Sequence, residues 1–384
     1  MTGPGPGRPG GPEDGAGPVP VPEDDGDPYG PPDEGPRPPR PRGRAGRRSG
    51  HPVRTVVLVA VVVVAAVLVG GTLWVQHEAA GGAPGPQVVA TVGPGTGASQ
   101  LAATLEAKGV IGSSLAYRIW SQFHGFPSVL QGSYAFRQHS SFGTVDQVIA
   151  AGPNVFPLDI PPGFTVAEVA TRVGQLPGHS RADFAAVADG GAVRSPWQPA
   201  GSTNLDGLLG TGVYVVVPGE TDATLLHAMV DRFDRLADRV GLQAGAVRLG
   251  MTPYQVITAA SIVEKEGVIQ KNLGPVARVI LNRLARDMPL QMDSTVLYSE
   301  GRDGGPVTST DLALQTPYNT YLNKGLTPTP ICFPSQAALE ATLDPPSGSW
   351  LYFVVVEQDG TEAFATTFPQ QQANEALAKS RGLG

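Results

Sequence analysis

The segment Pro253–Gln270, PYQVITAASIVEKEGVIQ, is the most informative stretch of this 384-residue chain. Thr252 is a favourable N-cap and proline fits the first helical position, so the segment is predicted to be a helix. At about 100° per residue, one side of this helix is an apolar stripe. The stripe consists of Val256, Ala260, Val263 and Gly267.

Two glutamates, Glu264 and Glu266, flank this stripe on opposite sides. Measured from Val256, Glu264 falls near ~80° and Glu266 near ~280°. Both carboxylates have apolar neighbours on the helical wheel. Periodicity alone therefore does not choose between them.

Downstream of this helix, the pattern changes from helical to loop-rich. A second helix is predicted over Pro275–Arg286, and polar clusters follow at Leu290–Tyr298 and Tyr318–Tyr321. The run Trp350–Val356, WLYFVVV, predicts a buried strand, with Phe364 in its hairpin partner. These elements predict a mixed α+β domain over residues 246–384.

Upstream, one order of elements occurs twice. Strand-like runs at Val88–Val92 and Gly132–Tyr134 enclose two helical patterns, Ala98–Lys108 and Ser114–Phe123. A strand-like run at 155–160 and a helical one at 165–176 begin the same order again. Strand, helix, helix, strand is the order of small wall-binding modules of the LysM type. We therefore expect a LysM-like α/β module over residues 88–245 and an α+β fold class for the whole chain.

The uncharged apolar run Thr55–Val75 predicts a membrane-spanning helix over residues 54–76. Arginines cluster between Arg37 and Arg54, so the N-terminus is expected in the cytoplasm and the remainder outside it. Residues 1–53, rich in Pro, Gly and Arg, predict a disordered cytoplasmic tail, and residues 77–87 a flexible linker. A cleaved signal peptide is the alternative.

Composition excludes several classes of function. The net charge of −7 argues against nucleic acid as a partner, and the single cysteine, Cys332, excludes an intramolecular disulfide. The six histidines lack the spacing of metal ligands, which disfavours a metal-dependent peptidase. We expect neither a metal nor another cofactor.

Six motifs occur in a fixed order: ASIVEKE, LNRL, LQMDSTVLY, TPYNTY, GLTPTPIC and LYFVV, between Ala260 and Val355. In this order they resemble the endolytic murein transglycosylases of the MltG or YceG-like family. The resemblance implies a single-pass cell-membrane protein whose outer domain cleaves peptidoglycan glycan strands to leave 1,6-anhydro ends. It also makes membrane-bound peptidoglycan synthases natural partners.

The same resemblance assigns roles to residues. It implies that Glu266 is the catalytic acid and base, with Glu264 as the alternative and otherwise a substrate-binding residue. The expected sugar-binding residues are Gln291, Asp293, Tyr318, Asn319 and Tyr321. The alternatives are structural roles. The side chains of the Tyr318–Tyr321 loop would then hydrogen-bond to the loop's own backbone, and Asp293 would cap the following turn.

Several positions depart from the family pattern. Leu205–Tyr214 (LDGLLGTGVY) stands where the family has a sequence like LEGYLFPDTY, and Glu362 stands where it often has histidine. A Glu-His-Asn triplet is replaced by Gln370–Gln372, and Phe333 and Ser335 replace Asn and Gly. These departures keep open a second hypothesis, a non-catalytic peptidoglycan-binding scaffold of the same fold.

Overall fold

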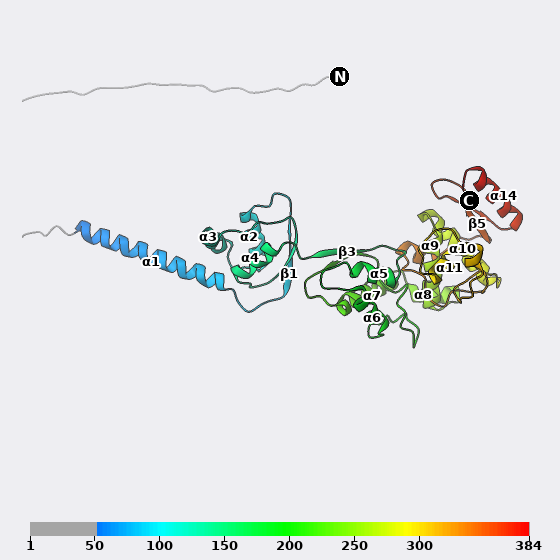
Figure 1. Ribbon diagram of the computed structural model, residues 1–384, viewed down its shortest axis with the longest axis horizontal. Coiled ribbons are helices and arrows are strands. Elements are labelled where there is room, and N and C mark those ends of the chain that lie inside the picture. Colours follow the sequence, from blue (N-terminus) through cyan, green and yellow to red (C-terminus); the bar gives the residue numbers. More distant parts are fainter. Residues whose placement is uncertain (1–51, 384) are drawn as a thin grey trace, which may run out of the picture. The chain divides into compact units, whose positions relative to one another are not determined.

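The computed structural model describes residues 52–383 and has an α+β fold of helices and two-stranded antiparallel sheets (Figure 1). The predicted α+β class is confirmed. The predicted disordered tail lies outside the described residues, except for its last two positions.

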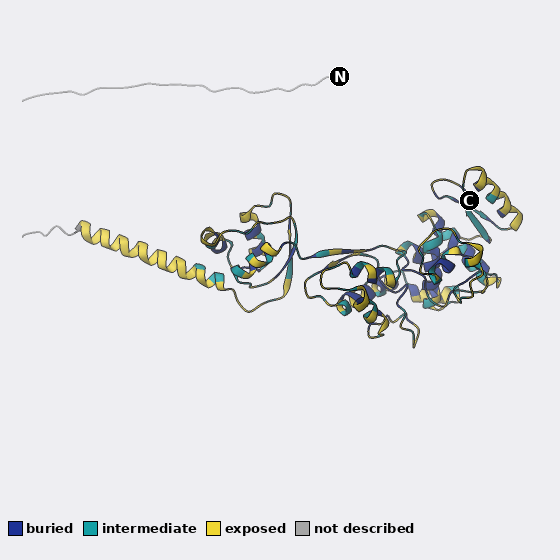
Figure 2. Cartoon of the chain, viewed as in Figure 1, coloured by how far each residue is buried: buried dark blue, intermediate teal, exposed yellow. Residues whose placement is uncertain are grey.

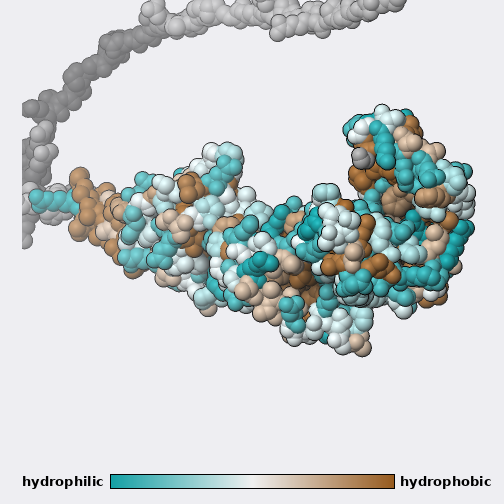
Figure 3. Space-filling view, turned by 45° about the vertical axis from the view of Figure 1, so that its right-hand side comes forward, coloured by the Kyte–Doolittle hydropathy of each residue, from teal (hydrophilic) through white to brown (hydrophobic). Residues whose placement is uncertain are grey.

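Helix α1, Pro52–Ala80, contains the predicted span. It is the one helix among residues 52–383 that is long and apolar enough to cross a membrane, and its apolar side chains are exposed (Figures 2 and 3). Such a helix is stable in lipid because its backbone hydrogen bonds are all made within the helix.

The segment predicted as a flexible linker is attached to the following module instead. Helix α1 continues to Ala80, and its Ala79 packs against the module's core. After the helix, the Gly82 N–H donates to the His139 carbonyl (2.8 Å) and the Gly85 N–H to that of Gln138 (2.9 Å). The sequence did not indicate these contacts because both partners lie more than 50 residues downstream.

The first module begins directly after these contacts. Strand β1 pairs antiparallel with β2, and Val88 lies opposite Phe136. Its own hydrophobic core, here called the first core, is built from residues between Ala90 and Ile149. The elements are β1 (Gln87–Val92), α2 (Ala98–Ala107), α3 (Ser114–His124), β2 (Gly132–Arg137) and α4 (Phe142–Ala151).

The second module repeats the order strand, helix, helix, strand, of which the sequence predicted the first strand and the first helix. Strand β3 pairs antiparallel with β4, and Phe156 lies opposite Val216. The elements are β3 (Phe156–Ile160), α5 (Val166–Val173), α6 (Arg181–Asp189) and β4 (Gly212–Val216). Two further helices follow, α7 (Asp222–Arg239) and α8 (Leu242–Leu249).

Helix α9, Pro253–Glu266, is buried on nearly all sides rather than along one stripe. Its Val256, Ile257 and Ala260 belong to the second core, which begins at Leu158 and reaches Leu343. On its other side Ala259, Ile262 and Val263 belong to a third core, which also contains residues of α10. The second core therefore crosses the domain boundary predicted at 245/246, and α9 is shared by both parts.

Helix α9 ends earlier than predicted, because Gly267 stops it. Gly267 has a ψ of 83°, outside the helical range, and a Cβ there would lie 2.5 Å from Leu273 Cδ2, so a larger residue would force that side chain to shift. Helix α10 (Gln270–Ala285) starts three residues later and holds Pro275 inside it. The break leaves Glu266 as the last residue of α9. Beyond α10 lie α11 (Asp293–Ser299), α12 (Ser309–Leu312) and α13 (Gln336–Leu343).

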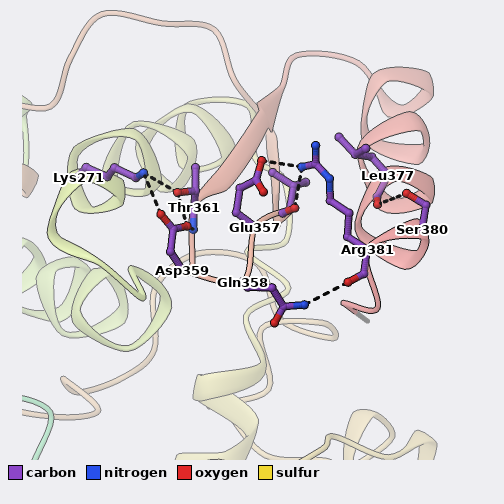
Figure 4. A network of polar contacts seen from close by, with 9 residues as sticks. Lys271, Glu357, Gln358, Asp359, Thr361, Leu377, Ser380 and Arg381 are labelled. Carbon is purple, nitrogen blue, oxygen red and sulfur yellow. Dashed lines mark hydrogen bonds and ion pairs between the residues drawn. The ribbon is translucent and has the colours of Figure 1, made fainter.

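A C-terminal hairpin completes the fold. Strands β5 (Tyr352–Val355) and β6 (Glu362–Ala365) pair with Phe353 opposite Phe364, as predicted, and α14 (Phe368–Ser380) packs on them. Polar contacts fasten the turn of the hairpin (Figure 4): Lys271 Nζ donates to Thr361 Oγ1 (2.5 Å), and Arg381 pairs with Glu357 (2.7 Å). The turn is thereby held against the start of α10.

Candidate active site

A cleft of about 580 Å³ lies where α5, the end of α9 and α11 meet. Its wall on the second module includes Thr165 and Glu168, and its opposite wall includes Asp293 and Ser294. Glu266 lines it and Glu264 does not. The remaining lining residues are Ala167, Thr171, Arg181, Asp206, Lys265, Leu297, Tyr298, Gly301, Arg302, Asp303, Gly304 and Ile331.

Glu266 is a half-buried carboxyl group held by one neighbouring hydroxyl. Ser294 Oγ donates to Glu266 Oε1 at 2.6 Å. Burial raises the pKa of Glu266, and the nearby Asp293 adds to this, while the Ser294 hydrogen bonds and the charge of Arg283 oppose it. Burial outweighs the opposing effects because a charge loses its hydration there. Glu266 therefore keeps its proton to a higher pH than a free glutamate.

Glu264 has a different environment. Its Oε2 accepts the backbone N–H of Ser335 (2.9 Å), the N-cap residue of α13. A carboxylate in this position satisfies a helix N-terminus. The helical wheel did not distinguish the two glutamates. In the structure Glu266 lines the cleft, whereas Glu264 binds the N-terminus of α13.

Asp293 and Tyr321 lie together beside this carboxyl group. Tyr321 Oη donates to Asp293 Oδ1 at 2.6 Å, and Asp293 occupies the first turn of α11 as it lines the cleft. Burial raises the pKa of Tyr321, and the neighbouring Asp293 and Glu266 add to the effect. Of the predicted sugar-binding residues, these two are the ones near Glu266.

The other predicted sugar-binding residues lie elsewhere. Gln291 is exposed with a left-handed φ of 52° and is not part of the cleft lining. Tyr318 Oη shares a hydrogen bond with Thr329 Oγ1 (2.9 Å), and its ring lies 5.0 Å from that of Tyr298. Asn319 is fully buried. The Asn319 amide donates to the carbonyls of Leu312 and Leu314, both at 2.9 Å, so its loop uses it internally.

We expect Asn319→Ala to lower stability rather than ligand affinity. The change removes two hydrogen bonds, to the carbonyls of Leu312 and Leu314, and each such bond contributes about 0.5–1.5 kcal/mol. Asn323→Ala is the matched control, because Asn323 makes similar bonds to Thr316 and Asn319 from an exposed position. Urea unfolding should show the larger loss for Asn319→Ala. Unchanged stability with weaker glycan binding would instead support the predicted sugar contact.

Sequence reasoning missed two residues of the cleft. In the sequence analysis both residues, Ser294 and Asp206, appeared only inside longer quoted segments. Asp206 is 7% exposed, accepts from the Val166 N–H (2.8 Å) and from Tyr298 Oη (2.6 Å), and burial raises its pKa. It lines the cleft and ties the start of α5 to α11. Only the side-chain geometry reveals this role.

A second acidic group, Glu362 on β6, lies near Glu266. It is 7% exposed, and its Oε2 has no hydrogen-bond partner within residues 52–383. Burial and the like charge of Glu266 raise the pKa of Glu362 to about 8, against a smaller opposing effect of Asn272. This is the position at which the sequence departs from the family histidine.

The comparisons with known proteins agree with these motifs. The model of the YceG-like family matches residues 90–376, so the chain belongs to the YceG-like family. An endolytic murein transglycosylase of Streptococcus pneumoniae (strain ATCC BAA-255 / R6) is 27% identical over 314 residues, covering 73% of this chain and 56% of the relative. The chain thus spans little more than half the length of that protein.

Two further proteins extend the likeness. An endolytic murein transglycosylase of Bacillus subtilis (strain 168) is 25% identical over 304 residues, covering 75% of this chain and 84% of the relative. The crystal structure of a putative YceG-like protein from Listeria monocytogenes has a TM-score of 0.53 at 24% identity, covering 75% of this chain and 98% of that one. This structural likeness bears on the fold alone.

Proposed function

We propose that the protein is a membrane-anchored lytic transglycosylase that cleaves nascent peptidoglycan strands between N-acetylmuramic acid and N-acetylglucosamine. The observation that carries the proposal is Glu266, a carboxyl group with a raised pKa that lines the cleft and is oriented by Ser294. Such a group still carries a proton at a pH where a free glutamate has lost it.

One carboxyl group is sufficient for this reaction. Protonated Glu266 donates its proton to the glycosidic oxygen as the bond from that oxygen to C1 of the muramic acid breaks. The C6 hydroxyl oxygen of the same sugar bonds to C1, and its proton passes to the Glu266 carboxylate. The products are a 1,6-anhydro end and a new free hydroxyl, and Glu266 is again protonated. A hydrolase would need a second carboxylate at a defined separation to activate water or to act as nucleophile.

The neighbours of Glu266 have supporting roles in this proposal. The Ser294 hydroxyl fixes the rotamer of the acid, and the Tyr321–Asp293 pair presents polar groups to the sugar hydroxyls. Asp206 is unsuited to the second carboxylate role, because hydrogen bonds from Val166 and Tyr298 occupy its two oxygens.

The apolar helix α1 supports a membrane location. With the arginines before it in the cytoplasm, the cleft would lie outside the membrane, where synthases release new glycan strands. Cleavage there would end strand elongation, and the membrane-bound synthases would be the protein partners.

A non-catalytic peptidoglycan-binding scaffold is the second candidate. The departures at Glu362 and Gln370–Gln372 favour it, since Glu362 and Gln371 are buried polar residues, each with one oxygen lacking a partner within residues 52–383. Buried polar atoms without a partner are rare in folded proteins, so the surroundings of Glu362 and Gln371 are unusual.

Product masses decide between these candidates. Purified full-length protein in detergent is incubated with un-crosslinked glycan strands, and the fragments are weighed by mass spectrometry. We expect fragments that carry anhydro ends, lighter by one water than hydrolysis products. Fragments that have gained water would identify a hydrolase, and intact strands that remain bound would identify the scaffold. Protein carrying Glu266→Gln, purified in the same way, controls for contaminating enzymes.

A further inference from the structure

Helix α3 carries an exposed apolar stripe. Leu115, Ile119 and Phe123 are 56%, 39% and 84% exposed, and their spacing of four residues puts them on one side of the helix. Leu130, just after the helix, is 58% exposed. Exposed apolar residues scattered singly are normal on protein surfaces, but a contiguous set on one helix indicates a contact surface.

The opposite side of α3 fixes this orientation. Tyr117 is fully buried, its ring lies 5.1 Å from that of Phe142, and its hydroxyl donates to Asp146 Oδ1 (2.5 Å). Ala116 and Ser121 are buried beside it. The helix therefore cannot turn its stripe inward without breaking the first core, so the stripe remains available to a partner.

The start of α3 lies beside the end of α1. A Cβ placed on Gly112, directly before the N-cap of α3, would lie 2.1 Å from Glu78 Oε2. Val75 and Ala79 of α1 also pack against the first core, to which Tyr117 belongs. At 1.5 Å per residue, Glu78 is only ~4.5 Å along the helix from Val75, where the apolar run ends. The module is thus joined to the edge of the span without a free linker.

We propose that the stripe on α3 inserts into the interfacial layer of the bilayer that α1 spans. The proposal rests on α1 being a retained anchor, as in the proposed function. Lipid is the occupant because the stripe belongs to the module that is joined directly to the edge of the span. The charge of α3 also fits, since the helix has no acidic residue and its Arg118 is exposed, which suits anionic headgroups. A contact of this kind sinks an apolar face about 5–10 Å into the headgroup boundary.

Lipid-borne quenchers test this contact in the full-length chain. The one native cysteine, Cys332, is fully buried, so an introduced cysteine can be labelled selectively with a fluorophore. Gln122→Cys places the label beside the intact stripe, Thr72→Cys places it on α1, and Val247→Cys places it on an exposed apolar site of α8. Each protein is reconstituted into vesicles of phosphatidylcholine and phosphatidylglycerol containing spin-labelled lipid.

We expect strong quenching at positions 72 and 122 and several-fold weaker quenching at position 247. Adding Leu115→Ser, Ile119→Ser and Phe123→Ser to the Gln122→Cys protein should reduce its quenching to the level at position 247. These side chains are exposed, so the melting temperature should stay near that of the parent, and this is measured alongside.

The outcomes separate the contact from the anchor. Quenching at position 72 without quenching at position 122 overturns the proposal and leaves the anchor standing; a protein partner for the stripe would give this result in pure lipid. Quenching at position 122 that survives the triple substitution also overturns it. Absence of quenching at position 72 overturns the anchor and the contact with it.

Discussion

Glu266→Gln is expected to reduce the rate of glycan cleavage by about 100- to 10,000-fold, the usual contribution of a positioned general acid and base. Glutamine keeps the shape of the side chain and can still accept from Ser294 Oγ, so the protein should remain folded. The measurement is the rate at which anhydro ends form on glycan strands, with the melting temperature as the check on folding.

Glu264→Gln is the matched control, two residues away on the same helix. It weakens the bond to the Ser335 N–H at the start of α13, so we expect a small loss of stability and nearly full activity. An inactive Glu264→Gln protein beside an active Glu266→Gln protein would reverse the assignment of the acid.

Glu362→Gln is expected to change how stability depends on pH. In the folded protein the pKa of Glu362 is raised from 4.5 to about 8. Between these values the unfolded chain has released the proton that the folded protein retains, so wild-type stability falls as pH rises from about 4.5 to 8 and then levels off. The difference corresponds to at most about 5 kcal/mol. Glutamine cannot ionise, so this part of the decline should disappear.

Urea unfolding of both proteins at pH 5, 6.5 and 8 measures this effect. Glu357→Gln is the control, because Glu357 lies in the same hairpin but is exposed and paired with Arg381. The variant at position 357 should follow the wild-type curve. If Glu362→Gln also follows the wild-type curve, the pKa of Glu362 is not raised in the folded protein, and this prediction is wrong.

Local pattern predicted much of the fold. The strand, helix, helix, strand order of the first module and the β5–β6 hairpin depend on periodicity and turn residues within short windows. They could therefore be predicted from the sequence. The end of α9 was predicted wrongly because Gly267 was counted as an apolar member of a stripe. The backbone leaves the helical conformation at Gly267, where Leu273 also approaches closely, and this contact arises only when the chain folds.

The site was less accessible from sequence. Glu264 and Glu266 look alike on a helical wheel, and what separates them is their partners, Ser335 and Ser294, which lie 71 and 28 residues downstream. The resemblance to the family pointed to Glu266. It also pointed to Asn319, whose amide instead donates to backbone carbonyls of its own loop. Polarity in a loop does not reveal whether a side chain faces a ligand or its own backbone.

The second core has a consequence for selectivity. The side chains that anchor α5 and those that anchor α9 belong to that one core, and Asp206 ties the start of α5 to α11. The α5 side and the α9 side of the cleft are therefore packed on the same core, which sets the distance between these two helices in the folded chain. In the proposed function, a cleft of this width would admit only the glycan strands that fit between α5 and α9. Substitutions at core positions far from Glu266, by shifting α5 against α9, would then change which strands are accepted and leave the acid itself untouched.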